Sequence, residues 1–179
     1  MPTSIDLRSS IVDAWRTNCR VTAVFVGELP APIWSLAIPA SPRRTVRMLL
    51  GHLHNARSRW LRTLGKPHGI AVPPLVDLRR VGRRDLLAAL ARSDKAMESL
   101  LVLGLDSGNQ VPPTPAYTWR NLPLDVGHVL TYFIAHEAHH RGQIVMIARE
   151  LGHRLPPSVT NGLWQWTQRK KEAGRTSSI

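Results

Sequence analysis

The 179-residue sequence predicts an all-α fold, a bundle of four long helices with one additional short helix near the C-terminal end. Apolar residues recur at helical spacing over four long stretches, and no stretch alternates apolar and polar residues for long enough to predict a strand. Prolines and glycines stand between the stretches, where helices end. We treat residues 1–179 as a single domain, since 43% hydrophobic residues in a chain of this length suffice for one core.

The first predicted helix covers residues 6–28, and Pro30 prevents its continuation. The second covers residues 42–64. Its start is predicted from the pair Ser41–Pro42, because serine caps a helix and proline is favoured in the first turn. Gly65 marks its end. This helix carries two of the histidines on which the functional interpretation depends.

The third predicted helix covers residues 83–103 and the fourth residues 124–151, which Gly152 closes. Between them lies the proline-rich loop 104–123, which is long for a bundle and is expected to frame a substrate pocket. A last short helix is predicted to begin near Ser158. Because the connection between the second and third helices is also long, the sequence does not require each helix to run opposite to the one before it.

The polar tail from Arg169 to Ile179 is expected to fray. A net charge of +12 raises the question of a nucleic-acid or anionic partner. However, the arginines are scattered in pairs such as Arg43–Arg44 and Arg79–Arg80, and the sequence contains no helix-turn-helix, zinc-finger spacing or aromatic RNA-binding motif. These observations argue against nucleic acid.

The chain contains one cysteine, Cys19, which excludes an internal disulfide and is expected to be a small buried side chain. No stretch approaches the roughly 18 apolar residues of a membrane span, and the first residues lack the pattern of a secretory signal. Together these features predict a cytoplasmic protein without a membrane partner.

The most informative motif lies on the fourth helix, where His136 and His140 stand one turn apart among its apolar positions. Two core-facing imidazoles at this spacing can bind the same metal ion, and zinc or nickel suits such ligands. Burying both rings and the carboxylate of Glu137 without an ion would be costly. His139 and His128 fall outside the apolar arc.

A third ligand must come from another helix, and the second helix offers His52 and His54. Each lies about 100° from the centre of the helix's apolar arc, on opposite flanks, so the angles alone favour neither. His68 and His153 are weaker candidates because they lie in predicted loops.

The residues Leu50–Gly51–His52–Leu53 followed by Trp60, together with the run His136-x-x-x-His140-Arg141-Gly142-Gln143, resemble the DinB/YfiT-like superfamily, the damage-inducible DinB family. The resemblance covers nearly the whole chain. It implies a DinB-like four-helix bundle and the metal ligands His52, His136 and His140, and so selects His52 over His54. It also implies a homodimer, and a stress-response setting is associated with the family. Characterised members include S-transferases and isomerases that use a low-molecular-weight thiol, and others are classed as hydrolases.

Residues 136–140 also match the His-Glu-x-x-His pattern of zinc proteases, in which the glutamate is the general base. The metzincin extension would need glycine at 143 and histidine at 146, but these are Gln143 and Met146. The protease interpretation is therefore set aside. Glu137 remains the candidate catalytic residue, as a base or as a group that orients a ligand.

Three imidazole ligands leave a coordination position open, which is typical of catalytic sites. The sequence thus predicts a metal-dependent enzyme of the thiol S-transferase or hydrolase class that activates a thiol or water against a small-molecule substrate. A thiol would come from a cofactor. The alternative is a non-catalytic metal-binding or nucleic-acid-associated stress protein.

Arg141 and Gly142 follow the predicted ligand His140 directly, and each has a predicted role. Gly142 is expected to let a neighbouring helix approach closely. Arg141 is expected either to form a structural salt bridge or to bind an anionic substrate, and the sequence leaves both open.

Overall fold

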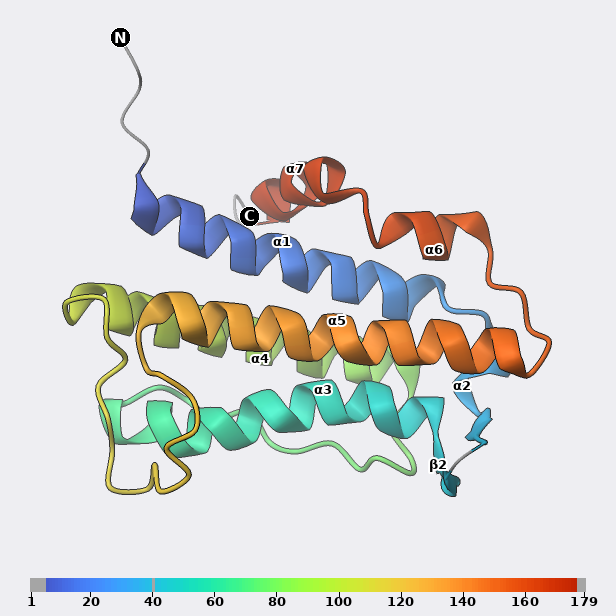
Figure 1. Ribbon diagram of the computed structural model, residues 1–179, viewed down its shortest axis with the longest axis horizontal. Helices are drawn as coiled ribbons and strands as arrows, with labels where there is room; N and C mark the ends of the chain where they lie inside the picture. Colours follow the sequence, from blue (N-terminus) through green and yellow to red (C-terminus); the bar gives the residue numbers. More distant parts are fainter. Residues whose placement is uncertain (1–5, 40, 177–179) are drawn as a thin grey trace, which may run out of the picture.

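The computed structural model describes residues 6–39 and 41–176 and shows four long helices packed side by side (Figure 1). These are α1 (Leu7–Glu28), α3 (Val46–Trp60), α4 (Arg83–Asp106) and α5 (Val126–Glu150). The predicted all-α class and the four long helices are confirmed.

Shorter elements connect and extend the bundle. They are α2 (Ala31–Trp34), the strands β1 (Ala37–Ile38) and β2 (Ser41–Thr45), a π-helical turn (Leu61–Gly65), a 3-10 turn (Lys66–His68), α6 (Pro157–Gly162) and α7 (Trp166–Thr176). In Figure 1, α6 and α7 lie along α1, on the side away from α3. The predicted single C-terminal helix is therefore two helices.

The start of the second long helix differs from the prediction. Ser41 and Pro42 belong to β2, which pairs with β1 in an antiparallel arrangement. The helix begins at Val46, and the hydroxyl of Thr45 caps it by accepting a hydrogen bond from the backbone N–H of Met48. Thr45 is thus the cap that the sequence pattern assigned to Ser41.

The long connection after α3 sets the direction of α4. Residues 69–82 run back along α3, as shown by the hydrogen bonds of Asn55 with the backbone of Val76. As a result α4 starts beside the N-terminal half of α3 and runs parallel to it. Leu49 and Leu50 share a cluster with Leu86, whereas Leu61 and Leu64 pack in another cluster with Met97 and Leu100.

Contacts between α1 and α5 show that these two helices are also parallel. Trp15 packs edge-on against Phe133, while Asn18 bonds Glu137 further along both helices. On α3 and α5, His52 contacts His136 and Trp60 contacts Phe133. The later residue of α3 thus meets the earlier residue of α5, so the two helices are antiparallel. This arrangement places the middle of α3 opposite the middle of α5.

The core consists of two apolar clusters. One is centred on Phe25, Leu50 and Ile144 and the other on Trp15, Met97 and Phe133. Buried polar side chains, including Arg57 and Glu137, lie at the level between them. Polar groups at this depth need hydrogen-bonding partners.

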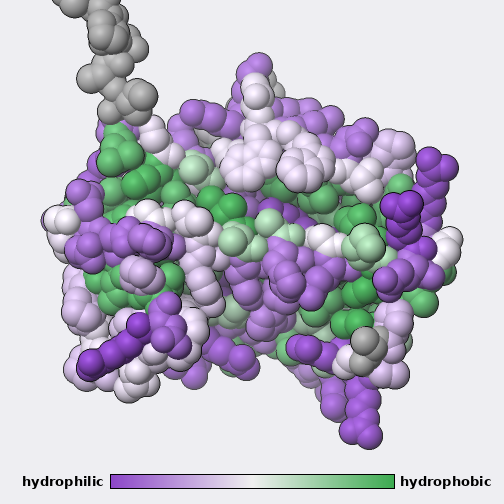
Figure 2. Space-filling model, in the orientation of Figure 1, coloured by the Kyte–Doolittle hydropathy of each residue, from purple (hydrophilic) through white to green (hydrophobic). Residues whose placement is uncertain are grey.

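Hydrophobic and hydrophilic residues are interspersed on the face drawn in Figure 2. Some large apolar side chains are exposed, among them Trp164 and Trp119. Within the described residues, no helix combines the length and the hydropathy that crossing a bilayer requires.

The C-terminal segment forms α7 as far as Thr176, so part of the tail that was expected to fray is helical in the structure. Arg169 is buried and pairs with Glu172, which also bonds Arg20 on α1. These ion pairs dock α7 against α1. The rest of the predicted tail, residues 177–179, lies outside the described residues.

Candidate metal centre

Three histidines from two antiparallel helices converge in the middle of the bundle. His52 comes from α3, and His136 and His140 come from consecutive turns of α5. One ring nitrogen of each lies within 4.8 Å of those of the other two. The rings meet edge to face, with centroid separations of 5.2, 5.0 and 4.7 Å. The structure therefore brings together the three residues predicted as ligands, and they could hold a metal ion.

The separation of the donor atoms fits a tetrahedral ion. The Nε2 atoms of His52 and His136 are 3.2 Å apart. Zn–N bonds of 2.0–2.1 Å at tetrahedral angles place two ligand nitrogens about 3.3 Å apart. Without an ion, two imidazoles that face each other through these atoms form at most one hydrogen bond. An ion would satisfy both nitrogens.

The environment keeps the three rings neutral. Partial burial is the largest cause that lowers the pKa of His52, His136 and His140. Burial and the repulsion of His140 and His52 together bring the pKa of His136 to about 4, and the positive charge of Arg44 also lowers the pKa of His52 and His140. Neutral imidazoles are the form that binds metals.

Gln143 fixes the orientation of one ring. The Nδ1–H of His140 donates to the Gln143 side-chain oxygen at 2.7 Å. This tautomer leaves the lone pair on Nε2 for a ligand bond. Ligand histidines commonly have such a partner on their other nitrogen, and the partner raises affinity. This role of Gln143 was not predicted from its sequence position, although a glutamine three residues after a ligand histidine is a usable signal.

His54 occupies the opposite flank of α3 from His52. It is completely buried, and its two ring nitrogens lie 3.1 Å from the Ser93 hydroxyl and 2.9 Å from the Pro74 carbonyl oxygen. His54 therefore joins α3 to α4 and to the returning segment 69–82. The choice between His52 and His54, which helical angles left open, follows from which flank faces α5.

The outer histidines lie away from the convergence point of the rings. His139 is exposed beside His140, and His128 is exposed and bonds the helix-capping Asp125. His68 and His153 lie outside the three-histidine group. Cys19 is buried, as expected, and burial raises its thiol pKa well above the ordinary value, which keeps the thiol protonated.

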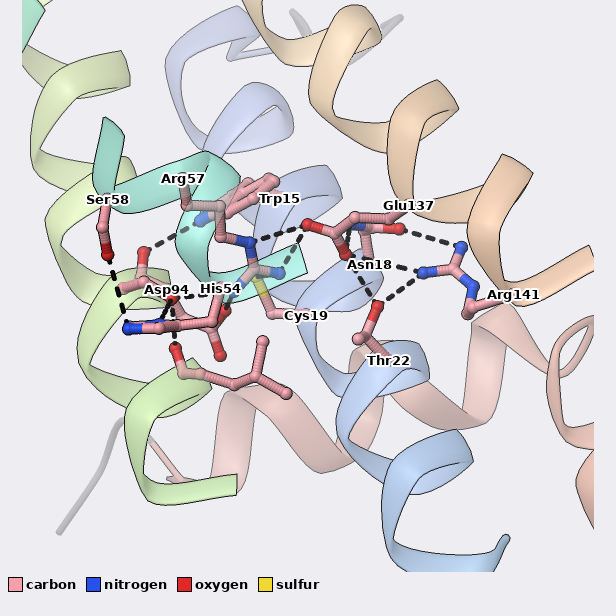
Figure 3. A network of polar contacts seen from close by, with 12 residues as sticks. Trp15, Asn18, Cys19, Thr22, His54, Arg57, Ser58, Asp94, Glu137 and Arg141 are labelled. Carbon is pink, nitrogen blue, oxygen red and sulfur yellow. Dashed lines mark hydrogen bonds and ion pairs between the residues drawn. The ribbon is translucent and has the colours of Figure 1, made fainter. Parts of the chain in front are cut away.

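Glu137 lies at the centre of a buried polar network that links four helices (Figure 3). Its carboxylate accepts hydrogen bonds from Asn18 (2.9 Å), Thr22 (2.7 Å) and Arg57 Nε (2.7 Å). The Arg57 guanidinium also pairs with Asp94 on α4. Burial opposes the positive charge of Arg57, but the two carboxylates outweigh this effect and raise its pKa.

This environment supports a positioning role for Glu137. It is fully buried, and its oxygens already accept three hydrogen bonds. To accept a proton from a substrate it would have to exchange these partners. The network ties Glu137, next to His136, to Arg57, which follows His52 on α3. The proton-acceptor role inferred from the sequence stays a prediction.

Arg141 belongs to the same network. It is buried, it donates to Thr22 and Asn18, and it lies 3.6 Å from the Glu137 carboxylate. Of the two roles left open by the sequence, the contacts favour the structural salt bridge. Burial lowers the pKa of this guanidinium, a cost that Glu137 partly offsets.

The expected packing role of Gly142 is wrong. Gly142 is exposed, and a side-chain carbon added there would meet nothing within 4 Å. Close approach is needed instead at Gly51, where an added carbon would lie 2.8 Å from a Leu78 methyl group. Gly51 allows segment 69–82 to pack against α3 directly beside His52.

A hollow and a group of aromatic rings flank the histidines. The hollow, of about 530 Å³, is lined by Arg44 of β2 and by His140, Gln143 and Met146 of α5. On the other side, Tyr132 stacks on His136 and contacts Trp60 edge-on. The Trp60 ring in turn lies beside the predicted pocket loop. These aromatic contacts could have been anticipated from the sequence, because Tyr132 lies one helical turn before His136.

Much of the positive charge serves the fold. Arg16 pairs with Glu98, Arg20 with Glu172, and Arg83 donates to two backbone carbonyls at the end of α1. Arg57 and Arg141 are buried in the central network. These contacts give structural partners to several of the arginines that raised the question of nucleic acid.

Comparison with known proteins gives one family assignment. The model described as the DinB family matches residues 1–173, which is nearly the whole chain. No match was found among curated proteins.

Proposed function

Because this chain belongs to the DinB family, we propose that it is a metal-dependent enzyme whose residues His52, His136 and His140 bind one divalent ion. The proposed reaction is activation of a thiol or of water against a small electrophile, in the S-transferase or hydrolase class. The observation that carries the proposal is the convergence of three neutral imidazoles whose ring nitrogens lie within 4.8 Å of one another, with those of His52 and His136 at 3.2 Å.

The donor set favours a catalytic over a structural ion. Structural zinc sites have four protein ligands, whereas catalytic sites have three and an exchangeable position. The group formed by the described residues contains three histidines and no fourth ligand. Zinc and nickel suit imidazole ligands. Such an ion supplies Lewis acidity, which favours the thiolate or hydroxide form of what binds the remaining position.

The protein's own groups would prepare the site. Gln143 holds His140 in the tautomer that presents Nε2. Glu137 and Arg57 fix α5 against α3, and thereby fix His136 opposite His52. The hollow beside Arg44 gives a small molecule access to His140. A thiol would have to come from a cofactor, since Cys19 is buried and protonated.

Activity measured with and without metal tests the proposal. The metal-free protein is loaded with Zn²⁺ or Ni²⁺ and assayed with a panel of low-molecular-weight thiols plus electrophiles, and with activated esters. We expect metal-dependent turnover that His52→Ala abolishes and that the control variant His128→Ala retains, because His128 is exposed outside the group. Stoichiometric metal binding without metal-dependent turnover would contradict it and favour a non-catalytic metal-binding protein.

A homodimer and a cytoplasmic location stay predictions of the sequence resemblance and composition. Sedimentation at several protein concentrations would test the first of these.

A further inference from the structure

An aromatic hollow of about 270 Å³ lies between the C-terminal end of α3 and the loop that precedes α5. Trp60 on the helix and Tyr117 and Trp119 on the loop supply its rings. The Trp60 ring lies 6.0 Å from Tyr117 and 5.7 Å from Trp119, measured between centroids. Trp119 remains 52% exposed despite this contact. The hollow thus presents aromatic faces to solvent.

The loop that forms one wall is held in place by specific hydrogen bonds. The Thr114 hydroxyl donates to the Thr63 carbonyl at 2.7 Å, which attaches the loop to the end of α3. The Tyr117 hydroxyl donates to the Leu122 carbonyl and accepts from the Leu122 N–H. A wall fixed in this way need not be ordered when a ligand binds, which reduces the entropic cost of binding.

The charge of the hollow is positive. Arg59 lines it, and none of the described residues that line it is acidic. The Arg59 guanidinium is exposed and forms no ion pair within the described part of the chain. An arginine next to exposed aromatic rings can bind a planar carboxylate through two parallel hydrogen bonds.

The hollow lies close to the metal centre, since Trp60, which lines it, contacts Tyr132, and Tyr132 stacks on His136. Arg59 follows His52 by seven residues, two helical turns on the same face, which corresponds to about 10 Å along the axis. The positive charge of Arg59 acts on His52. The hollow is therefore about two helical turns from the histidines, with Tyr132 between Trp60 and His136.

We propose that this hollow binds the aromatic carboxylate end of a small molecule, with Arg59 pairing with the carboxylate and Trp60 and Trp119 packing on the ring. Its volume equals that of about nine water molecules, which suits a single ring with its carboxylate. That the other end of this molecule reacts at the histidines rests on the function proposed above. Binding of the aromatic carboxylate itself does not require the metal.

Benzoate binding to the full-length metal-free protein tests the proposal, measured by ligand-observed NMR titration. Benzyl alcohol has the ring without the charge, and acetate has the charge without the ring. We expect benzoate to bind at least about fivefold more tightly than either, because the ring and the carboxylate each contribute. No detectable benzoate binding, or equal binding of benzyl alcohol, would overturn the proposal.

Matched variants locate the site. Arg59→Gln and Trp119→Ala should each weaken benzoate binding about fivefold. Arg62→Gln removes the same charge one helical turn away, where Arg62 lines a different hollow, and Trp164→Ala removes an exposed tryptophan between α6 and α7. Both controls should stay within about twofold of the wild type. Equal loss in Arg59→Gln and Arg62→Gln would show non-specific attraction to a cationic protein and overturn the proposal.

The metal-free design separates the two proposals. A failure in this titration leaves the metal-dependent turnover assay unaffected. Conversely, loss of metal binding or turnover would disprove the proposed reaction while leaving benzoate binding measurable.

Discussion

Two groups of polar side chains join α3 to α5, and they differ in how their hydrogen-bonding atoms are satisfied. In the network around Glu137, oppositely charged groups alternate, and each has protein partners. The described buried side-chain atoms without a partner, Arg47 Nε and Arg169 Nε, lie elsewhere. In the histidine group, by contrast, the rings of three neutral histidines converge through their nitrogen atoms, and the group found among the described residues includes no carboxylate.

The difference indicates separate roles. A completed network of buried charges holds helices in one register, whereas ring nitrogens that face each other, as those of His52 and His136 do, are suited to an added ion. The network lies next in sequence to the ligands, because Glu137 follows His136 and Arg57 follows His52 by five residues. The network around Glu137 therefore positions the three histidines that would bind the metal ion.

The largest expected effect comes from breaking the network. Arg57→Met removes the cation that faces Glu137 and Asp94, and it leaves buried carboxylate charge without its partner. We expect the free energy of unfolding to fall by about 3–5 kcal/mol, measured by urea denaturation.

Arg16→Met is the matched control, since it breaks the part-exposed pair with Glu98. It should cost no more than about 1 kcal/mol. Equal losses in the two variants would mean that burial does not distinguish the network from a surface pair.

A smaller effect is expected from removing the hydrogen bond between the ligand His140 and Gln143. Gln143→Ala removes the acceptor for His140 Nδ1–H and should weaken metal binding about 10- to 100-fold, measured by competition with a chelator. Gln143→Glu keeps an acceptor and should retain most of the affinity. If Gln143→Ala binds metal as tightly as the wild type, Gln143 has no orienting role.

The smallest effect concerns pH. Burial and the repulsion of His140 and His52 lower the pKa of His136 to about 4 in the folded protein, below the ordinary value of 6.5. Between these values the unfolded chain binds a proton that the folded chain does not, so the stability of the metal-free protein should fall as pH decreases from 6.5 to 4. Thermal unfolding midpoints of the wild type should fall more steeply over this range than those of His136→Gln. If the unfolding midpoints of the wild type and of His136→Gln fall equally steeply with pH, His136 does not have the lowered pKa.

Helical spacing was sufficient to predict the four long helices, because each has an apolar face that repeats every three to four residues. It did not place the start of α3, since Ser41–Pro42 satisfies a helix-cap pattern and is paired instead with β1, a partner that the local sequence does not identify. The ordered α7 was missed for a similar reason, because Arg20 and Glu172 are 152 residues apart.

The candidate site was predictable only in part. The spacing of His136 and His140 placed them on one face of α5, but the angles of His52 and His54 are symmetric about the apolar arc. Only the packing of α3 between α4 and α5 distinguishes them, and the resemblance supplied the choice beforehand. The partners of Glu137 on other helices come from α1 and α3, and Arg57 links them to Asp94 on α4, so the burial of Glu137 in a charged network could not be read from the motif.

Metal content measured for a set of histidine variants tests the central claim most directly. After loading with Zn²⁺ or Ni²⁺ and removal of excess metal, the wild type, His54→Gln and His139→Ala should each retain about one ion per chain. His52→Ala, His136→Ala and His140→Ala should lose most of it while keeping the helical circular dichroism of the wild type. Full metal occupancy in His52→Ala would contradict the account.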